Sequence, residues 1–212
     1  MIILFDLDGT LIESTDAIVS TFHHSFKMHN VPLVEDEKIK QLIGYPLEIM
    51  YAELGIAKND ILDFVDTYKE EYRKISTQKT ELLPNALEAI ELASTFAELG
   101  IVTTKTGKYS KVLMEHFNLM KYFKVLVGRE DVDKPKPDAE PIIKALESFN
   151  FKGKDVYMIG DTKLDLLCAK NAKVNSIAVL CGYGKKEELQ KFTKIIVDDT
   201  LQAVNYLKSM KK

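Results

Sequence analysis

The sequence predicts an α/β protein in which a doubly wound parallel sheet is interrupted by a small helical unit. Three observations predict this class. A short apolar run, Ile2–Phe5, opens the chain and ends in acidic and turn residues, as a buried strand does. From about residue 83 onward, helix-like and strand-like segments alternate, which is typical of a parallel sheet covered by helices on both faces. Residues 14–76, between these parts, contain no convincing strand.

The intervening segment is predicted to consist of helices. The first begins at Ser14 or Thr15, either of which can act as its N-cap, and carries an apolar stripe. Three more are expected at residues 35–43, closed by Gly44, from Pro46 to Gly55, and at residues 58–76. We therefore expect a helical insertion at residues 14–78 in a core domain made of residues 1–13 and 79–212.

The alternation in the core domain gives its elements in order. Helices are expected at residues 84–100, 110–117, 138–149 and 162–172, and from Thr200. Strands are expected at residues 2–5, 101–103, 125–127, 156–159, 176–180 and 195–197. Gly100 is expected to close the first of these helices.

Composition narrows the function classes. The chain has 212 residues, is 46% hydrophobic and carries a formal net charge of −3, which argues against a nucleic-acid surface. Its first apolar run stops at Asp6 without a preceding basic region, and no stretch approaches the length of a membrane span. Two cysteines, Cys168 and Cys181, suit a reducing compartment. We expect a cytoplasmic protein without a nucleic-acid or membrane partner, either a monomer or a homodimer.

Polar residues follow four of the predicted strands. In chain order they are Asp6 and Asp8; Thr103, Thr104 and Lys105; Lys134; and Asp161 with Asp165 one helical turn later. Ligands of open parallel sheets bind outside the carboxyl ends of the strands, so these groups should converge at one edge.

Each group also has a plain structural interpretation. Asp8 before Gly9 is a hairpin-turn signal, and Thr103 is a good strand residue. Lys134 fits a solvated proline-rich loop, Asp161 fits an N-cap, and Asp165 fits the first turn of a helix. The combination of all of them at strand ends is what favours a catalytic interpretation.

This set of groups matches phosphoryl transfer through an aspartyl-phosphate. In this hypothesis Asp6 is the nucleophile and Asp8 is the general acid and base. Thr103 and Lys134 are expected to hold phosphoryl oxygens. Backbone N–H groups are expected to add donors at Leu7, Asp8 and Thr104.

A magnesium ion is expected at the same place, because hard divalent cations prefer oxygen ligands. Its ligands would be a carboxylate oxygen of Asp6, the backbone carbonyl of Asp8 and a carboxylate oxygen of Asp161. Asp165 would support the site by holding a water or orienting Asp161.

The motifs resemble the four signatures of the haloacid dehalogenase superfamily, and most closely those of its phosphoglycolate phosphatase group. They are Asp6-Leu7-Asp8-Gly9-Thr10, Val102-Thr103, Lys134-Pro135 and Gly160-Asp161-Thr162-Lys163-Leu164-Asp165. The resemblance implies a core with strand order 5-4-1-2-3 and an α-helical cap that opens and closes over the substrate. It also implies a Mg²⁺-dependent phosphatase acting on a small phosphorylated metabolite, such as a phosphoglycolate-like phosphomonoester.

The resemblance places Gly44 and Tyr45 of the cap near the substrate, and Lys105 could bind a substrate carboxylate. A sugar phosphatase, nucleotidase, pyrophosphatase or phosphomutase of the same superfamily stays open. Ile18 occupies the place of a cap histidine in the mutase branch, which makes a mutase the weaker alternative. A non-catalytic phospho-ligand binding protein or a phosphate-switched module is the alternative from another class.

Overall fold

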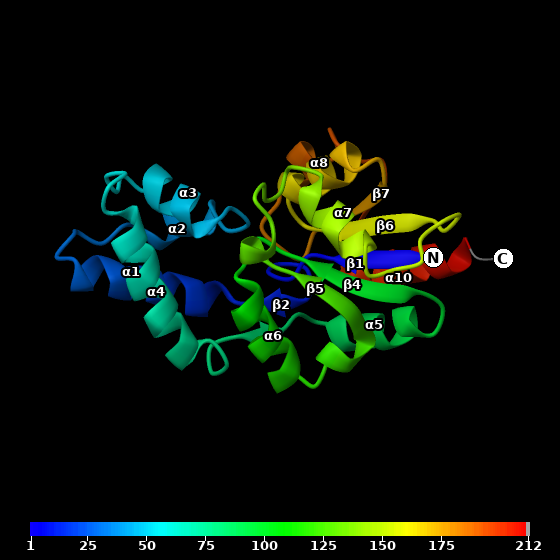
Figure 1. Ribbon diagram of the computed structural model, residues 1–212, viewed down its shortest axis with the longest axis horizontal. Coiled ribbons are helices and arrows are strands. Elements are labelled where there is room, and N and C mark those ends of the chain that lie inside the picture. Colours follow the sequence, from blue (N-terminus) through cyan, green and yellow to red (C-terminus); the bar gives the residue numbers. More distant parts are fainter. Residues whose placement is uncertain (211–212) are drawn as a thin grey trace.

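The computed structural model describes residues 1–210 and contains one parallel sheet of six strands (Figure 1). The strands are β1 (Ile2–Phe5), β4 (Glu98–Val102), β5 (Phe123–Val127), β6 (Val156–Gly160), β7 (Asn175–Val179) and β8 (Ile196–Val197). Their order in the sheet is β5-β4-β1-β6-β7-β8. Numbered along the chain, the first five have the expected order 5-4-1-2-3, and β8, the strand expected at residues 195–197, extends the sheet beyond β7 as a sixth strand.

The sheet is covered on both faces, as a doubly wound fold requires. Successive side chains of a strand point to opposite faces. Accordingly, Ile3 and Phe5 of β1 belong to one apolar cluster, while Ile2 and Leu4 belong to another. The first cluster includes residues of α5 (Ala86–Ser94), α6 (Gly107–His116) and α10 (Thr200–Ser209), and the second includes residues of α7 (Glu140–Leu146) and α8 (Lys163–Asn171). The short α9 (Lys186–Leu189) follows β7. The predicted fold class is confirmed.

The helical insertion lies at the carboxyl ends of the strands, on the side of the sheet away from the N-terminus (Figure 1). It consists of α1 (Thr15–Met28), α2 (Asp36–Lys40), α3 (Leu47–Glu53) and α4 (Ile61–Ile75). An aromatic cluster of its own holds it together, in which the ring of Phe22 lies 4.7 Å from that of Tyr51 and 5.0 Å from that of Tyr68. We keep residues 14–78 as a proposal for the limits of this cap, and residues 1–13 and 79–212 as a proposal for the core.

Several elements differ from the sequence-based expectations. The second helix ends at Lys40 rather than at residue 43, and residues 41–44 form turns. Gly100 does not close a helix, because α5 already ends at Ser94 and Gly100 lies inside β4. The tight packing of the sheet explains its presence there, since a Cβ on Gly100 would lie 2.9 Å from Leu4 Cδ2.

A two-stranded antiparallel ribbon was not expected from the sequence. β2 (Ile12–Glu13) pairs with β3 (Glu81–Leu82) where the chain leaves the core and returns to it. Two short 3₁₀ turns, η1 (Met120–Tyr122) and η2 (Arg129–Asp131), flank β5. Within residues 1–210, the helices are too short or too polar to cross a bilayer.

Candidate active site

The first acidic residue of the chain, Asp6, is placed by the central strand. β1 ends at Phe5, and the N–H of Asp6 donates to the carbonyl of Ile159 in β6 at 2.9 Å. This bond holds Asp6 between two neighbouring strands, where it is only 2% exposed. Burial, reinforced by the charge of Asp165, raises the pKa of Asp6 from 3.8 to about 7, although Lys136 opposes the shift.

The lysine that reaches Asp6 is Lys136, not the predicted Lys134. The Lys136 ammonium lies 2.8 Å from Asp6 Oδ1 and 2.5 Å from Asp165 Oδ1, and Lys136 is 3% exposed. Lys134 is exposed instead. The reason is local: its backbone N–H donates to Glu140 at the start of α7 (2.9 Å), which holds this part of the loop at the surface. Although burial favours a neutral amine, the two carboxylates hold the pKa of Lys136 above its usual range.

Two of the remaining acids, Asp161 and Asp165, converge on Asp6. Carboxylate oxygens of Asp6, Asp161 and Asp165 lie within 4.8 Å of one another, and all three residues are buried. Asp161 follows β6 and accepts hydrogen bonds from Thr10 Oγ1 (2.9 Å) and from the N–H of Tyr183 (2.8 Å). Burial, with the charges of Asp165 and Asp6, raises the pKa of Asp161 well above its usual value.

Asp165 is bound on both of its carboxylate oxygens. Thr162 is the N-cap of α8, and its N–H and hydroxyl donate to Asp165 Oδ2 at 3.0 and 2.7 Å in a capping box. Lys136 occupies the other oxygen. Both carboxylate oxygens of Asp165 are therefore engaged, so Asp165 is placed to orient its neighbours rather than to offer a free oxygen.

The donor set of this cluster fits a divalent cation. Three buried carboxylates face one ammonium, which leaves an excess of negative charge that an ion of two positive charges would neutralise. The backbone carbonyl of Asp8 accepts no hydrogen bond from residues 1–210, so it is free to act as a further oxygen ligand. Asp6, Asp161 and the Asp8 carbonyl are thus the groups that could hold Mg²⁺.

The carboxylate of Asp8 points to a different set of partners. Its Oδ1 accepts a hydrogen bond from Ser14 Oγ and lies 2.9 Å from the Lys105 ammonium. That ammonium also lies 4.7 Å from the centre of the Tyr72 ring. Burial favours the neutral amine, but the charge of Asp8 keeps the pKa of Lys105 above its usual range. Lys105, predicted as a substrate contact, is therefore already engaged by Asp8.

Free hydrogen-bond donors surround the site where a phosphoryl group is expected. Thr103 is 4% exposed, and its hydroxyl oxygen accepts the N–H of Lys105 at 3.2 Å, which leaves the hydroxyl proton to donate elsewhere. Among residues 1–210, the N–H groups of Leu7, Asp8 and Thr104 have no acceptor. Clustered free N–H groups are typical of anion sites.

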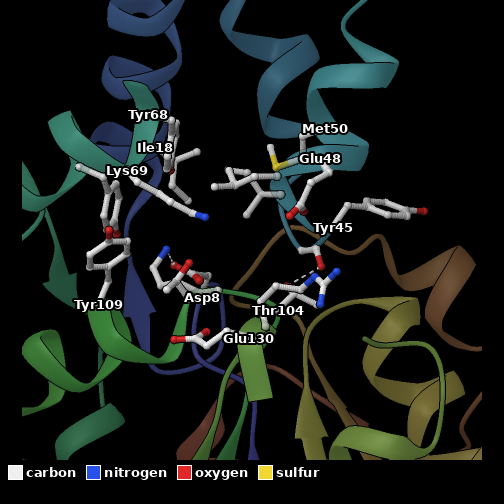
Figure 2. Close-up of a pocket in the computed structure, with 17 residues that line it drawn as sticks. Asp8, Ile18, Tyr45, Glu48, Met50, Tyr68, Lys69, Thr104, Tyr109 and Glu130 are labelled. Carbon is white, nitrogen blue, oxygen red and sulfur yellow. Dashed lines mark hydrogen bonds and ion pairs between the residues drawn. The ribbon is translucent and has the colours of Figure 1, made fainter. Parts of the chain in front are cut away.

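A cavity of about 220 Å³ separates this edge of the sheet from the helical insertion (Figure 2). Asp8 and Thr104 line it from the core, and Gly44 and Tyr45 line it from the loop before α3. Thr104 Oγ1 donates to the Gly44 carbonyl at 2.7 Å and so joins the two parts. Figure 2 shows the Tyr45 hydroxyl directed away from Asp8, although the resemblance implied that Tyr45 lies near the substrate.

Some residues of the site were not identified from the sequence. The structure adds Thr10, Ser14 and Lys136, and on the cap Glu48 and Lys69. Nothing in the local sequence distinguishes Lys136 from Lys134, since both precede a proline in the same loop. Thr162, which caps α8, could have been identified from the sequence. A threonine three residues before an acid at the start of a helix is the pattern of a capping box, here Thr162 and Asp165.

The sequence matches a family model of haloacid dehalogenase-like hydrolases over residues 3–179. The chain belongs to this family. It is 33% identical over 183 residues to a candidate pyrophosphatase PpaX from Caldanaerobacter subterraneus subsp. tengcongensis, which covers 84% of this chain and 80% of that protein.

Solved structures of the family have the same fold. A candidate haloacid dehalogenase-like hydrolase from Bacteroides fragilis is 28% identical, with a TM-score of 0.88 over 95% of this chain and 98% of its own. A candidate phosphoglycolate phosphatase from Lactobacillus plantarum is 25% identical, with a TM-score of 0.86 over 96% of this chain and 97% of its own. The predicted family, fold class and enzyme class, a phosphatase of the haloacid dehalogenase type, are confirmed.

Proposed function

We propose that this protein is a Mg²⁺-dependent phosphatase that hydrolyses a small phosphorylated metabolite through an aspartyl-phosphate on Asp6. The observation that carries the proposal is the buried contact of Asp6 with Lys136 at 2.8 Å, within a cluster that also contains Asp161 and Asp165. A carboxylate held beside an ammonium and free N–H donors is suited to attack phosphorus, because the charge of the transferred group has partners in place.

The reaction would proceed in two steps. In the first, an oxygen of Asp6 forms a bond to phosphorus, the bond to the leaving oxygen breaks, and Asp8 supplies a proton to that oxygen. In the second, Asp8 removes a proton from water, which attacks phosphorus and releases phosphate and free Asp6. Ser14 and Lys105 orient the Asp8 carboxylate for both proton transfers. Thr103, Lys136 and the free N–H groups would hold the phosphoryl oxygens.

A bound Mg²⁺ would supply positive charge to the transferred group and keep Asp6 ionised. Asp6, Asp161 and the Asp8 carbonyl would hold it, and Asp165 would orient Asp161 and Lys136. The burial of all three carboxylates supports this assignment, because such a cluster without a cation carries uncompensated charge.

The substrate is proposed to be small, because the cavity beside Asp8 has a volume of about 220 Å³ and the helical insertion lines one side of it. The relatives support two specific classes to test, a phosphoglycolate-like phosphomonoester and pyrophosphate. The two free thiols, Cys168 and Cys181, support a cytoplasmic location for this activity.

The test is phosphate release from a panel of phosphomonoesters and pyrophosphate, with Mg²⁺ or with EDTA. Asp6→Asn should reduce turnover at least about 1000-fold without unfolding the protein, because an amide oxygen is a far weaker nucleophile toward phosphorus than a carboxylate. Asp63→Asn is the matched control, since Asp63 is exposed on α4. Quenched-flow mass spectrometry should detect one phosphoryl group on Asp6. Turnover by Asp6→Asn at the wild-type rate would overturn the proposal.

A further inference from the structure

The cavity beside Asp8 has a wall whose chemistry the phosphoryl transfer does not use. This wall belongs to the helical insertion: Glu48 comes from α3, and Tyr68, Lys69 and Tyr72 come from α4. Figure 2 shows Glu48 and Lys69 directed into the same space from opposite sides, above Asp8. Because Asp8 is the proposed proton donor to the leaving oxygen, this wall faces the leaving group.

Glu48 lacks a partner. Its Oε2 is buried, and no donor among residues 1–210 makes a hydrogen bond to it. An unpaired buried carboxylate oxygen costs free energy, and a hydrogen bond to a charged acceptor is among the stronger ones. The missing donor is therefore expected on the molecule that fills the cavity.

The charges of the cavity wall cancel. They are three acids and three bases: Asp8, Glu48 and Glu130, and Lys69, Lys105 and Arg129. Asp8 pairs with Lys105, and Glu130 accepts two backbone N–H groups at the start of α6. Arg129 Nε is also buried without a hydrogen-bond partner among residues 1–210, so the cavity presents an unpaired donor as well as the unpaired Glu48 oxygen. A carboxylate or a second phosphate placed here would meet the unpaired charge of Glu48.

Tyrosine rings line another part of the cavity, together with the apolar side chains of Ile18, Ile43, Leu47 and Met50. The Tyr68 and Tyr72 rings stack with centroids 5.5 Å apart, and the Tyr109 ring lies 6.1 Å from that of Tyr72. Aromatic faces combine apolar area with polar edges, so they pack well against molecules that carry both C–H faces and hydroxyl groups.

Resting on the proposed phosphatase function, we infer that the leaving group is an uncharged polyhydroxyl group, a sugar or polyol, with one hydroxyl that donates to Glu48. Hydroxyl groups suit both charged side chains, because a hydroxyl group can donate a hydrogen bond to Glu48 and can accept one from Lys69. The carbon face of a sugar would pack on the tyrosines. This assignment separates the protein from enzymes that remove phosphate from glycolate or from a second phosphate.

The experiment compares kcat/KM for esters that differ in the leaving group. Ribose 5-phosphate, glucose 6-phosphate and glycerol 1-phosphate carry uncharged hydroxyl groups, whereas 2-phosphoglycolate, pyrophosphate and O-phosphoserine carry charged groups. p-Nitrophenyl phosphate reports the phosphatase activity itself, because it needs neither kind of contact. The wild type should prefer at least one sugar or polyol ester to every charged one by about 10-fold or more.

Two variants of α3 complete the design. Glu48→Gln should lower kcat/KM for the preferred sugar or polyol ester by about 10- to 100-fold, mainly through a higher KM. The ratio of kcat/KM for that ester to kcat/KM for p-nitrophenyl phosphate should fall as well. Glu53→Gln, an exposed acid on the same helix, should change neither.

The outcomes separate the two proposals. Turnover of p-nitrophenyl phosphate with a preference for a charged leaving group would overturn the inference and leave the phosphatase function standing. Wild-type selectivity in Glu48→Gln, in a sample whose circular dichroism spectrum shows that it is folded, would also overturn the inference and leave the phosphatase function standing. Absence of turnover on every ester, p-nitrophenyl phosphate included, would overturn the phosphatase function and this inference with it.

Discussion

Replacing Lys136 by methionine removes the ammonium that compensates the buried acids. Met keeps the length and most of the volume of the side chain, so the main change is the loss of one charge beside Asp6 and Asp165. Breaking a buried ion pair by removing one partner costs about 3–5 kcal/mol of unfolding free energy, because the remaining charge is left uncompensated. Lys134→Met is the matched control, since Lys134 lies in the same loop but is exposed.

This cost converts to a measurable change in melting temperature. An unfolding entropy of about 2.1 cal/mol/K per residue gives about 0.45 kcal/mol/K for 212 residues. Lys136→Met should therefore melt about 7–11 °C below the wild type in EDTA at neutral pH, and Lys134→Met within about 1 °C of it. Lower pH should restore part of the loss in Lys136→Met, because protonation removes the charge that Lys136 had compensated.

Thermal unfolding followed by circular dichroism measures the difference, and phosphate release with Mg²⁺ measures the catalytic effect. Lys136→Met should lose at least about 100-fold in kcat/KM, and Lys134→Met should stay within about twofold of the wild type. Equal melting temperatures for the two variants would refute the compensation argument. A loss of turnover confined to Lys134→Met would show that the loop places the other lysine at the phosphate.

Three more predictions concern the acidic cluster. In EDTA, the free energy of unfolding should fall as pH rises from about 4 to about 7. The pKa of Asp6 is raised to about 7, so in this range the folded state binds a proton that the unfolded state has released. Asp6→Asn should flatten the plot of melting temperature against pH, and an unchanged slope would contradict this. Mg²⁺ at about 100 times its Kd should stabilise the wild type by about 2.7 kcal/mol, which raises the melting temperature by about 6 °C in calorimetry. Asp161→Asn should lose most of this shift. A full shift in Asp161→Asn would show that the metal binds elsewhere. Gly182→Ala should weaken Mg²⁺ binding about 10-fold, because the added Cβ would clash with Asp161 Oδ2 and with the Gly9 carbonyl oxygen. A wild-type Mg²⁺ titration curve for this variant would show that Asp161 need not stay in place.

The edge of the sheet at which the site lies could be predicted from the sequence, because strand ends of a parallel sheet meet at one edge whatever the loops do. Asp6 and Asp161 follow adjacent strands directly, so their convergence needed only the correct strands. Lys136 is different, because its place depends on how a loop beyond β5 folds. The N–H groups of residues 133 and 134 donate hydrogen bonds to Glu140, and these bonds decide which lysine turns inward; such contacts leave no pattern in the local sequence.

The helices and long strands were predictable because their apolar periods extend over several residues. The ribbon of β2 and β3 was not, because strands of two residues have no measurable period. The predicted helix boundary at Gly100 was wrong, because a glycine often marks the end of a helix. Here close packing within the sheet requires the glycine instead. Glu48 gave no signal because an acid in the first turn of a helix is ordinary on the surface.

The β2–β3 ribbon makes the helical insertion an exchangeable module. Ile12 pairs with Leu82 and Glu13 with Glu81, so the two points at which the insertion joins the core are already neighbours. A short turn is enough to connect an antiparallel pair, so residues 15–80 could be replaced without moving β1, Asp6 or Lys136 and with Ser14 kept beside Asp8. The proposed nucleophile is held by the sheet, while Glu48, Tyr68, Lys69 and Tyr72 on the other side of the cavity are held by the insertion. Selectivity can therefore be rebuilt by grafting another insertion onto the ribbon, and the nucleophile keeps its setting throughout.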